Sequence, residues 1–317
     1  MDAAIVCEGL IKRYGNVTAL DGLDLEVPAG SLFGFLGPNG AGKTTTIRLL
    51  SGLAWPTAGR MVVAGLDPSR GDIQLRLRIS HQDQQAKLYG WMKGRELLEF
   101  VGRLFGFHGP NLRSRVDEVL EKTGLVEAAS RRIAGYSGGM RQRLNLAQAL
   151  INHPQVLFLD EPASSLDPAG RHDVLDLLAN LRGQVTVFMS SHILEDVEKV
   201  CDRVAIIDRG HLLADATMVE LQGRFAEPVF AIELEPGQAG AADLVRTLGQ
   251  SALVSGIGRD GPLLRVTVTD ASRAGPEVMR ILATSGVHVA RFERLRPSLE
   301  DIFLLLVPSE RHPGAHA

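Results

Sequence analysis

The chain has 317 residues, of which 45% are hydrophobic, and a formal net charge of −3 at pH 7. This length is enough for one large hydrophobic core and a second, smaller domain. The slightly acidic balance, without any cluster of basic residues, excludes the polybasic surface of a nucleic-acid-binding protein, and we expect no nucleic-acid partner.

The N-terminus and the two cysteines indicate a cytoplasmic protein. The segment 1–10 contains acidic residues and lacks the charged-then-apolar pattern of a signal peptide. Cys7 and Cys201 are far apart in the sequence, so we expect two buried thiols in a reducing compartment rather than a disulfide. No apolar run approaches the ~20 residues that cross a bilayer. A function at a membrane would therefore need a second chain that supplies the membrane-spanning part.

Residues 1–224 are expected to form an α/β domain. Short runs of β-branched and apolar residues, typical of buried parallel strands, alternate with segments of helical spacing. This alternation predicts a mostly parallel sheet covered by helices on both faces. We expect strands at 5–10, 20–27, 31–36, 156–159 and 185–189, and helices at 45–52, 95–107, 112–124 and 140–152.

Residues 225–317 are expected to form a separate, smaller α+β domain. The composition changes near residues 224–228, and glycine and proline are frequent at 235–240, 256–262 and 272–276. The order of the elements between these segments resembles a split βαβ, ferredoxin-like sandwich. We expect strands at 229–234, 263–268 and 287–292, helices at 241–248 and 277–284, and a last helix from Ser298.

The strongest chemical signal is a glycine-rich loop between a predicted strand and a predicted helix. Its sequence, GPNGAGKT, follows the phosphate-binding pattern GxxxxGK[ST], in which glycines let backbone N–H groups approach phosphate oxygens. The positive end of the following helix adds to this attraction. Lys43 is expected to reach the β- and γ-phosphates of a nucleotide, and the Thr44 hydroxyl to bind Mg²⁺. The alternative, an ordinary turn before Lys-Thr, does not explain the flanking strand and helix. The predicted nucleotide-binding residues are Gly37, Pro38, Asn39, Gly40, Ala41, Gly42, Lys43, Thr44 and Thr45.

Two carboxylates follow the predicted strand 156–159, at the strand end where ligands bind in open α/β sheets. Asp160 is expected to hold Mg²⁺ through its water shell, and Glu161 to act as general base toward the attacking water. An isolated Asp-Glu pair at a strand end is more often a helix cap or a surface pair. Together with the phosphate loop it predicts a Walker B site.

The segment YSGGM (136–140) resembles the signature of the ABC (ATP-binding cassette) ATPase family, usually written LSGGQ, with Tyr136 in place of Leu and Met140 in place of Gln. A serine hydroxyl and bare backbone amides at a helix start form a second phosphate site. The resemblance implies that Ser137, Gly138, Gly139 and Met140 close over the γ-phosphate of ATP held by a partner subunit. Two chains would then sandwich two ATP molecules head to tail. The alternative, an ordinary helix N-cap, leaves the other family matches unexplained.

Two of these matches concern the nucleotide and the loop that responds to the permease. Tyr14 lies where the family has an aromatic side chain that stacks on adenine, although alone it would be read as a surface turn residue. Gln84 matches the loop glutamine that touches Mg²⁺ and senses the permease. The family commonly has proline before this glutamine, whereas this chain has Asp83, and Gln82 and Gln85 are alternative candidates for the same role.

Two further matches lie after the Walker B segment. Asp167 matches the loop that crosses the dimer interface, and His192 matches the switch histidine that hydrogen-bonds the γ-phosphate. A single histidine at a strand end is usually only a polar terminus, but here it completes the family's set of motifs.

The last predicted helix narrows the branch of the family. The segment RPSLEDIF (296–303) looks like the tail of ATPase subunits of drug, antibiotic and polysaccharide exporters. Ser298 is expected to cap the helix. The apolar stripe of this helix is expected either to pack within its own small domain or, as the resemblance implies, to support subunit assembly. The stripe consists of Leu299, Ile302, Phe303 and Leu306.

The resemblance implies an ATP hydrolase that uses ATP and Mg²⁺. Its expected partners are a second copy of the same or a homologous ATPase subunit and a transmembrane permease, which would hold the chain at the inner face of the cell membrane. Two alternatives stay open. A non-transport ABC ATPase usually has two cassettes or long coiled coils, whereas here each motif occurs once and the intervals are short. An importer ATPase carries a C-terminal extension that resembles a β-barrel, whereas this tail has the pattern strand, helix, strand, strand, helix, strand.

Overall fold

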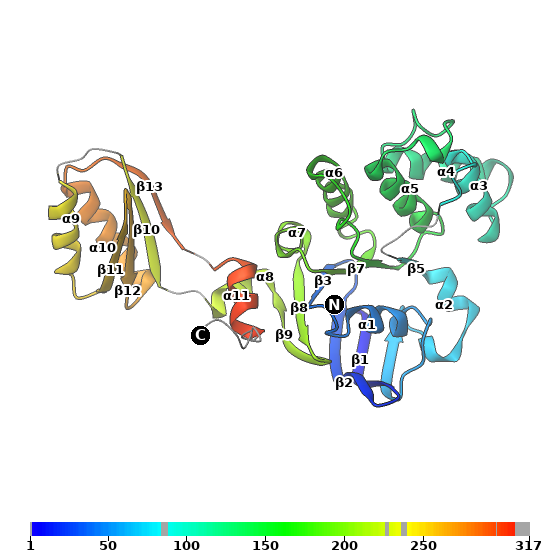
Figure 1. Cartoon of the computed structure of the whole chain (residues 1–317), viewed down its shortest axis with the longest axis horizontal. Helices are drawn as coiled ribbons and strands as arrows, with labels where there is room; N and C mark the ends of the chain where they lie inside the picture. Colours follow the sequence, from blue (N-terminus) through cyan, green and yellow to red (C-terminus); the bar gives the residue numbers. More distant parts are fainter. Residues whose placement is uncertain (1, 84–87, 226–227, 236–239, 296, 308–317) are drawn as a thin grey trace, which may run out of the picture. The chain divides into compact units, whose positions relative to one another are not determined.

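The computed structural model describes residues 2–83, 88–225, 228–235, 240–295 and 297–307 (Figure 1). Contacts divide the chain into two units. One contains the residues up to Met218 together with those from Phe303 onward, and the other is Val219–Ile302. The domain boundary expected between residues 224 and 225 stays a prediction. Every helix within the described ranges is too short or too polar to cross a lipid bilayer.

The first unit is built on a six-stranded sheet. Its strands are β3 (Leu32–Leu36), β5 (Ile79–Gln82), β6 (Val156–Asp160), β7 (Thr186–Ser191), β8 (Arg203–Asp208) and β9 (His211–Thr217). They lie in the order β5-β6-β7-β3-β8-β9, and the neighbours are parallel except for the antiparallel pair β8 and β9. Every residue of β3, β6 and β7 is buried, which explains the nearly uninterrupted apolar sequences of β3 and β6 and the apolar centre of β7. The predicted mostly parallel sheet is confirmed.

A second, antiparallel sheet shares the core of this unit. Its strands β1 (Ala3–Tyr14), β2 (Val17–Pro28) and β4 (Ala58–Val63) lie in the order β2-β1-β4. Side chains of both sheets and of helix α1 (Lys43–Leu50) form one hydrophobic cluster, in which the rings of Phe33 and Phe188 stack with centroids 5.6 Å apart. Cys7 and Cys201 are buried free thiols, as predicted, and burial raises the pKa of Cys7 to about 12.

Three helices pack together and form the helical part of the first unit, visible as a group in Figure 1. They are α3 (Gly94–Leu104), α4 (Gly109–Lys122) and α5 (Gly138–Leu150). The buried Arg115 side chain joins α4 to the end of α5, because its guanidinium donates hydrogen bonds to the carbonyl oxygens of Leu150 and Ile151. These carbonyls lie at a helix C-terminus, where a cation is favourable. The other helices of this unit are α2 (Ile73–Arg78), α6 (Pro168–Ala179), α7 (Leu194–Val200), and the 3-10 turns η1 (Pro68–Arg70) and η2 (Ile133–Gly135).

The second unit is a four-stranded antiparallel sheet with two helices on one face (Figure 1). Its elements follow in the order β10 (Val229–Leu234), α9 (Ala241–Gly249), β11 (Val254–Asp260), β12 (Leu263–Val268), α10 (Ala271–Thr284) and β13 (Val289–Arg294). The strand order is β11-β12-β10-β13, with Ile232 of β10 opposite Leu264 and Phe292. Two helices complete the described chain: α8 (Met218–Arg224), which opens this unit, and α11 (Leu299–Leu306), which spans its end at Ile302. The α+β character predicted for the C-terminal region is confirmed.

Two predicted details of this unit differ from the structure. The glycine-rich segment 256–262 was expected as a loop, but most of it belongs to β11, which pairs with β12 along its backbone. Backbone pairing with a neighbour outweighs the low strand propensity of Gly256 and Gly258. Helix α10 begins at Ala271, six residues earlier than expected, because Asp270 caps it by accepting hydrogen bonds from the backbone N–H groups of Ser272 and Arg273.

Candidate functional site

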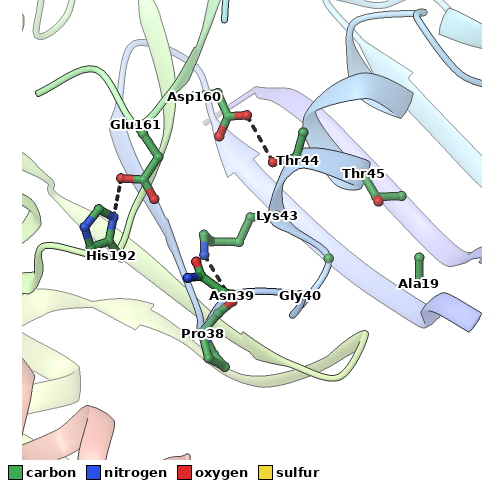
Figure 2. Close-up of a pocket in the computed structure, with 11 residues that line it drawn as sticks. Ala19, Pro38, Asn39, Gly40, Lys43, Thr44, Thr45, Asp160, Glu161 and His192 are labelled. Atoms are coloured by element: carbon green, nitrogen blue, oxygen red, sulfur yellow. Dashed lines mark hydrogen bonds and ion pairs between the residues drawn. The ribbon is translucent and has the colours of Figure 1, made fainter. Parts of the chain in front are cut away.

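The glycine-rich loop between β3 and α1 forms one wall of a pocket of about 560 Å³ (Figure 2). The pocket also receives the ends of β6 and β7, so side chains more than a hundred residues apart in sequence meet there. The lining residues are Ala19, Pro38, Asn39, Gly40, Gly42, Lys43, Thr44, Thr45, Asp160, Glu161 and His192. Gly37 and Ala41 belong to the loop but lie behind the pocket wall: Ala41 is buried, and a Cβ on Gly37 would lie 2.3 Å from the Ile207 carbonyl oxygen.

Two glycines of the loop have backbone conformations that other residues rarely adopt. Gly40 has φ 81° and Gly42, which precedes α1, has φ 113°. A Cβ on Gly42 would also lie 2.7 Å from the Ala19 carbonyl oxygen. The glycines therefore give the loop its curvature and expose its backbone to the pocket.

Lys43 is the cation of the pocket. Its side chain is buried, and Nζ donates hydrogen bonds to the carbonyl oxygens of Gly37 at 2.6 Å and Pro38 at 3.2 Å. Burial lowers the pKa of Lys43 from its usual value, and the nearby carboxylates of Glu161 and Asp160 oppose that shift. A buried ammonium held by the loop itself is well placed to meet the charge of a phosphate group.

Asp160 is held between two hydroxyl groups. Thr44 Oγ1 donates to Asp160 Oδ2 at 3.0 Å, and Ser190 Oγ donates to Asp160 Oδ1 at 2.5 Å. Asp160 and Ser190 lie opposite each other in the parallel pair β6 and β7. A hydroxyl and one carboxylate suit Mg²⁺, which usually takes few protein ligands and completes its shell with water and phosphate oxygens. The described residues contain no cluster of three or more His, Cys, Asp or Glu side chains that could hold a metal ion.

Glu161 and His192 form a pair at the mouth of the pocket (Figure 2). His192 Nδ1 lies 2.6 Å from Glu161 Oε2. The Glu161 side chain is largely buried, at 10% exposure, whereas that of His192 is 54% exposed. Glu161 has a left-handed backbone with φ 53°, and its N–H donates to the carbonyl and hydroxyl oxygens of Ser190. The pairing of β6 with β7 thus directs the Glu161 carboxylate toward His192.

The signature residues do not line this pocket. Ser137 is the N-cap of α5, and its Oγ accepts a hydrogen bond from the Met140 backbone N–H at 3.2 Å. Ser137 and Gly138 are exposed, whereas Tyr136 is buried and donates its hydroxyl proton to the Ala128 carbonyl oxygen at 2.7 Å. Tyr136, at the position where the family usually has leucine, therefore fixes the signature loop to the backbone at Ala128.

Tyr14 and Asp167, two further predicted residues, do not line the pocket. Tyr14 is 47% exposed at the end of β1, and Lys12 Nζ lies 4.7 Å from the centre of its ring. Asp167 is exposed and caps α6 by accepting a hydrogen bond from the Gly170 N–H at 3.1 Å. Gln84 and the alternative Gln85 lie outside the described residues.

The other alternative, Gln82, ends β5 and lies opposite Leu159. Its side chain is buried, and its amide atoms make no hydrogen bond with the described residues. Because Gln82 does not line the pocket, its position does not favour it as the loop glutamine.

Comparisons with known proteins agree with the family resemblance found in the sequence. The family model "ABC transporter" matches residues 20–164, and the model "ATP-binding protein DrrA1-3-like, C-terminal domain" matches residues 217–307. The daunorubicin resistance ATP-binding protein DrrA3 of Streptomyces coeruleorubidus is 41% identical over 98% of this chain and 98% of its own length. This chain belongs to the ABC transporter family. The daunorubicin/doxorubicin resistance ATP-binding protein DrrA of Streptomyces peucetius is 37% identical over 96% of this chain and 92% of its own length.

Solved structures of ABC transporter proteins have a fold similar to that of the cassette of this chain. The structure of cbiO1 from Clostridium perfringens, described as part of the ABC transporter complex cbiONQ, has a TM-score of 0.65 and is 26% identical. It covers 70% of this chain and 92% of its own. The chain is thus an ATP-binding, ATP-hydrolysing subunit of an ABC transporter, which decides against the non-transport alternative.

Two residues important for this geometry were missed from the sequence. Ser190 accepts a hydrogen bond from the Glu161 backbone N–H and donates one to Asp160, so it holds both residues. Gln142 of α5 donates to the Pro162 carbonyl oxygen at 2.6 Å and so connects the signature helix to the segment after Glu161. No local pattern indicates either contact, because each depends on which strands and helices become neighbours.

Proposed function

We propose that this ABC transporter ATPase is the motor of an exporter. Two copies, or one copy and a homologous subunit, bind two ATP molecules head to tail and drive a separate transmembrane permease. The subunit would then lie at the cytoplasmic face of the cell membrane, held there by the permease. Support comes from the two relatives named for resistance to daunorubicin and doxorubicin and from the C-terminal domain that they share with this chain. We infer a drug-like small molecule as the exported substrate class.

One observation carries the head-to-tail arrangement. The pocket contains the phosphate loop, Asp160, Glu161 and His192, whereas the signature serine Ser137 is exposed and lies outside the lining residues. The pocket is therefore half of a phosphate site, and the exposed signature loop is the matching half of another. A second subunit, turned head to tail, would supply each missing half.

The residues of the half-site have distinct roles in this proposal. Lys43 and the backbone N–H groups of the loop bind the β- and γ-phosphates. Thr44, Asp160 and Gln84 would hold Mg²⁺, which neutralises charge on the phosphates when bound. Glu161 accepts the proton of the attacking water, and His192 orients Glu161 and contacts the γ-phosphate.

Adenine and the partner subunit are contacted from outside the pocket. Tyr14 would stack on adenine with the ring face that Lys12 does not cover. Ser137, Gly138, Gly139 and Met140 would bind the γ-phosphate held by the partner, and Asp167 would lie at the interface between the two subunits.

An exposed aromatic pair supports a permease partner. Tyr89 and Trp91 are 52% and 73% exposed, with ring centroids 6.1 Å apart, shortly after the predicted permease-sensing Gln84. Neighbouring exposed aromatic side chains are typical of protein interfaces. The importer alternative has less support, because the C-terminal unit is an α+β sandwich rather than a β-barrel.

The Glu161→Gln variant tests this function. The substitution keeps the shape of the side chain but removes the proton acceptor, so hydrolysis should fall by ~10²–10⁴-fold while ATP binding persists. The variant should then accumulate as an ATP-bound dimer in size-exclusion chromatography with ATP and Mg²⁺. The control is Glu195→Gln, which removes an exposed carboxylate from α7 and should leave both the rate and the monomer unchanged. Hydrolysis by Glu161→Gln at the wild-type rate would exclude the proposed general base.

A further inference from the structure

A charged pair joins the two helices that follow the interface loop and the switch segment. Arg171 Nε of α6 donates to Asp196 Oδ1 of α7 at 2.5 Å. The Asp196 side chain is 1% exposed and that of Arg171 is 28% exposed. A carboxylate this deeply buried is costly unless a cation compensates it, so the position of α7 depends strongly on Arg171.

The neighbouring residue of α6 touches the signature helix. A Cβ added to Gly139 would lie 3.3 Å from Gly170 Cα, so the first turns of α5 and α6 approach each other backbone to backbone. Gly170 and Arg171 are adjacent, and they are the third and fourth residues after the N-cap Asp167. The first turn of α6 therefore contacts the signature helix through Gly170 and α7 through Arg171.

Helix α7 begins close to the catalytic pair Glu161 and His192. His192 is two residues before α7, and Ser191 Oγ accepts a hydrogen bond from the Ile193 N–H at 2.9 Å, which restrains the segment around His192. On its inner side α7 packs on β3, where a Cβ on Gly34 would lie 2.4 Å from Val197 Cγ1. A seven-residue helix has little stability of its own, so such tertiary contacts determine its orientation.

We propose that Arg171 and Asp196 are positioning residues for ATP hydrolysis. They fix α7, and with it His192, to the turn of α6 that abuts the signature helix. Engagement of the signature loop with the ATP of a partner subunit is thereby coupled to the placement of His192 against Glu161. This inference rests on the proposed head-to-tail function and adds to it a physical connection between the two half-sites of one subunit.

If Arg171 and Asp196 had a purely structural role, their replacement would change kcat differently than if they position His192. Replacing a buried ion pair by apolar side chains of similar volume is often neutral or stabilising. The double variant Arg171→Met, Asp196→Leu leaves no unpaired charge and should therefore keep the wild-type melting temperature and ATP affinity. If the pair positions His192, kcat should still fall about 10–100-fold with KM unchanged, because small displacements of catalytic groups have effects of this size. Arg171→Lys, which keeps the positive charge, should retain more activity than the double variant.

The matched control is a similar ion pair elsewhere in the same unit. Arg203 Nε donates to Asp215 Oδ1 at 2.6 Å and joins β8 to β9, so neither residue belongs to α6 or α7. The variant Arg203→Met, Asp215→Leu should leave kcat unchanged. ATPase activity of the full chain, alone and with its co-purified permease, thermal melting and ATP titration are measured for all variants.

Three outcomes decide the proposal. A low kcat with normal melting and normal ATP affinity, confined to the Arg171 and Asp196 variants, supports it. Wild-type kcat in the apolar double variant, or an equal fall in the control pair, overturns it. In either case Glu161→Gln tests the general base separately: if that variant is also fully active, the proposed function fails rather than only the coupling.

Discussion

The two units of this ABC transporter ATPase differ in what they bury. Among the described residues, every buried polar or charged side chain lies between Lys43 and Asp196, and the buried side chains of Val219–Ile302 are all apolar. Burying polar groups is costly, and a fold retains them where they perform a function. Two of the buried charged side chains of the cassette, Lys43 and Asp160, line the nucleotide pocket, whereas the apolar core of the C-terminal unit contributes to stability. Five predictions test this contrast, from the largest expected effect to the smallest.

The largest effect should follow from removing the C-terminal region. Deletion of the residues after Arg224 should abolish co-purification with the permease while ATP binding remains measurable, because all nucleotide motifs precede that point. The measurement is recovery of the permease in a pull-down, together with an ATP titration of the truncated chain. The structure groups Phe303 and the following residues with the cassette, so a loss of ATP affinity would show that the domain boundary is wrong. Undiminished recovery with full transport would exclude a role of the C-terminal region in assembly.

A cavity in the C-terminal core should affect stability alone. Leu264 is fully buried in β12, and Leu264→Ala should lower the free energy of unfolding of this unit by about 2–5 kcal/mol. Chemical denaturation measures this loss, and Met279→Ala, at a side chain 56% exposed in the same unit, is the control with little expected effect. ATP affinity should not change in either variant. If it fell in parallel with stability, the division of labour between the two units would be wrong.

The two phosphate-binding faces of the cassette should respond differently to substitution. Lys43→Ala removes a charged partner of the phosphates and should weaken ATP binding to the monomer by about 10–100-fold, the effect of losing a charge-assisted hydrogen bond. Ser137→Arg should leave monomer affinity intact and prevent ATP-dependent dimerisation. Lys199→Ala, at an exposed position of α7, controls for the loss of a positive charge. Equal loss of affinity in Lys43→Ala and Ser137→Arg would contradict the head-to-tail arrangement.

The smallest effect concerns the start of α11. Ser298 Oγ accepts a hydrogen bond from the Asp301 N–H at 3.1 Å, and Asp301 Oδ2 accepts bonds from the Ser298 hydroxyl and N–H. Ser298→Ala should cost about 1 kcal/mol, the usual effect of losing an N-cap, seen as faster amide exchange in α11. Ser298→Thr keeps the hydroxyl and should behave like the wild type.

The same cap makes this effect dependent on pH. The hydrogen bonds from Ser298, chiefly that of its hydroxyl, lower the pKa of Asp301. A lowered pKa in the folded state means that the stabilisation is present above the pKa of the unfolded chain and is lost as pH falls through the folded value. The difference between Ser298→Ala and the wild type should therefore shrink below about pH 4. A difference that stayed constant down to pH 2 would contradict this account of the cap.

Local patterns in the sequence were enough to predict one half of the candidate site. The phosphate loop lies between a buried strand and a helix, and Asp160 and Glu161 follow a buried strand, so both motifs are recognisable from adjacent residues. Their convergence in one pocket follows from parallel pairing, which places the carboxyl ends of strands at one edge of the sheet. The roles assigned to these residues remain predictions.

Other features depend on contacts between distant segments and could not be read from the sequence. Ser190 meets Asp160 because β6 and β7 are neighbours, and Arg171 meets Asp196 because α6 and α7 are packed together. Strand β11 forms in spite of its glycines because β12 supplies the backbone partners. In each case a tertiary neighbour outweighs the local pattern, and a single sequence does not reveal that neighbour.

The left-handed backbone of Glu161 makes stability and activity compete at one position. For a residue with a Cβ this conformation costs about 1–2 kcal/mol of conformational free energy, whereas glycine adopts it without penalty. Random substitution toward glycine would therefore relieve strain in the fold while removing the predicted general base. A survey of stabilised but inactive variants should therefore find Glu161→Gly among them. The strain of this single residue is a local trade of stability for activity.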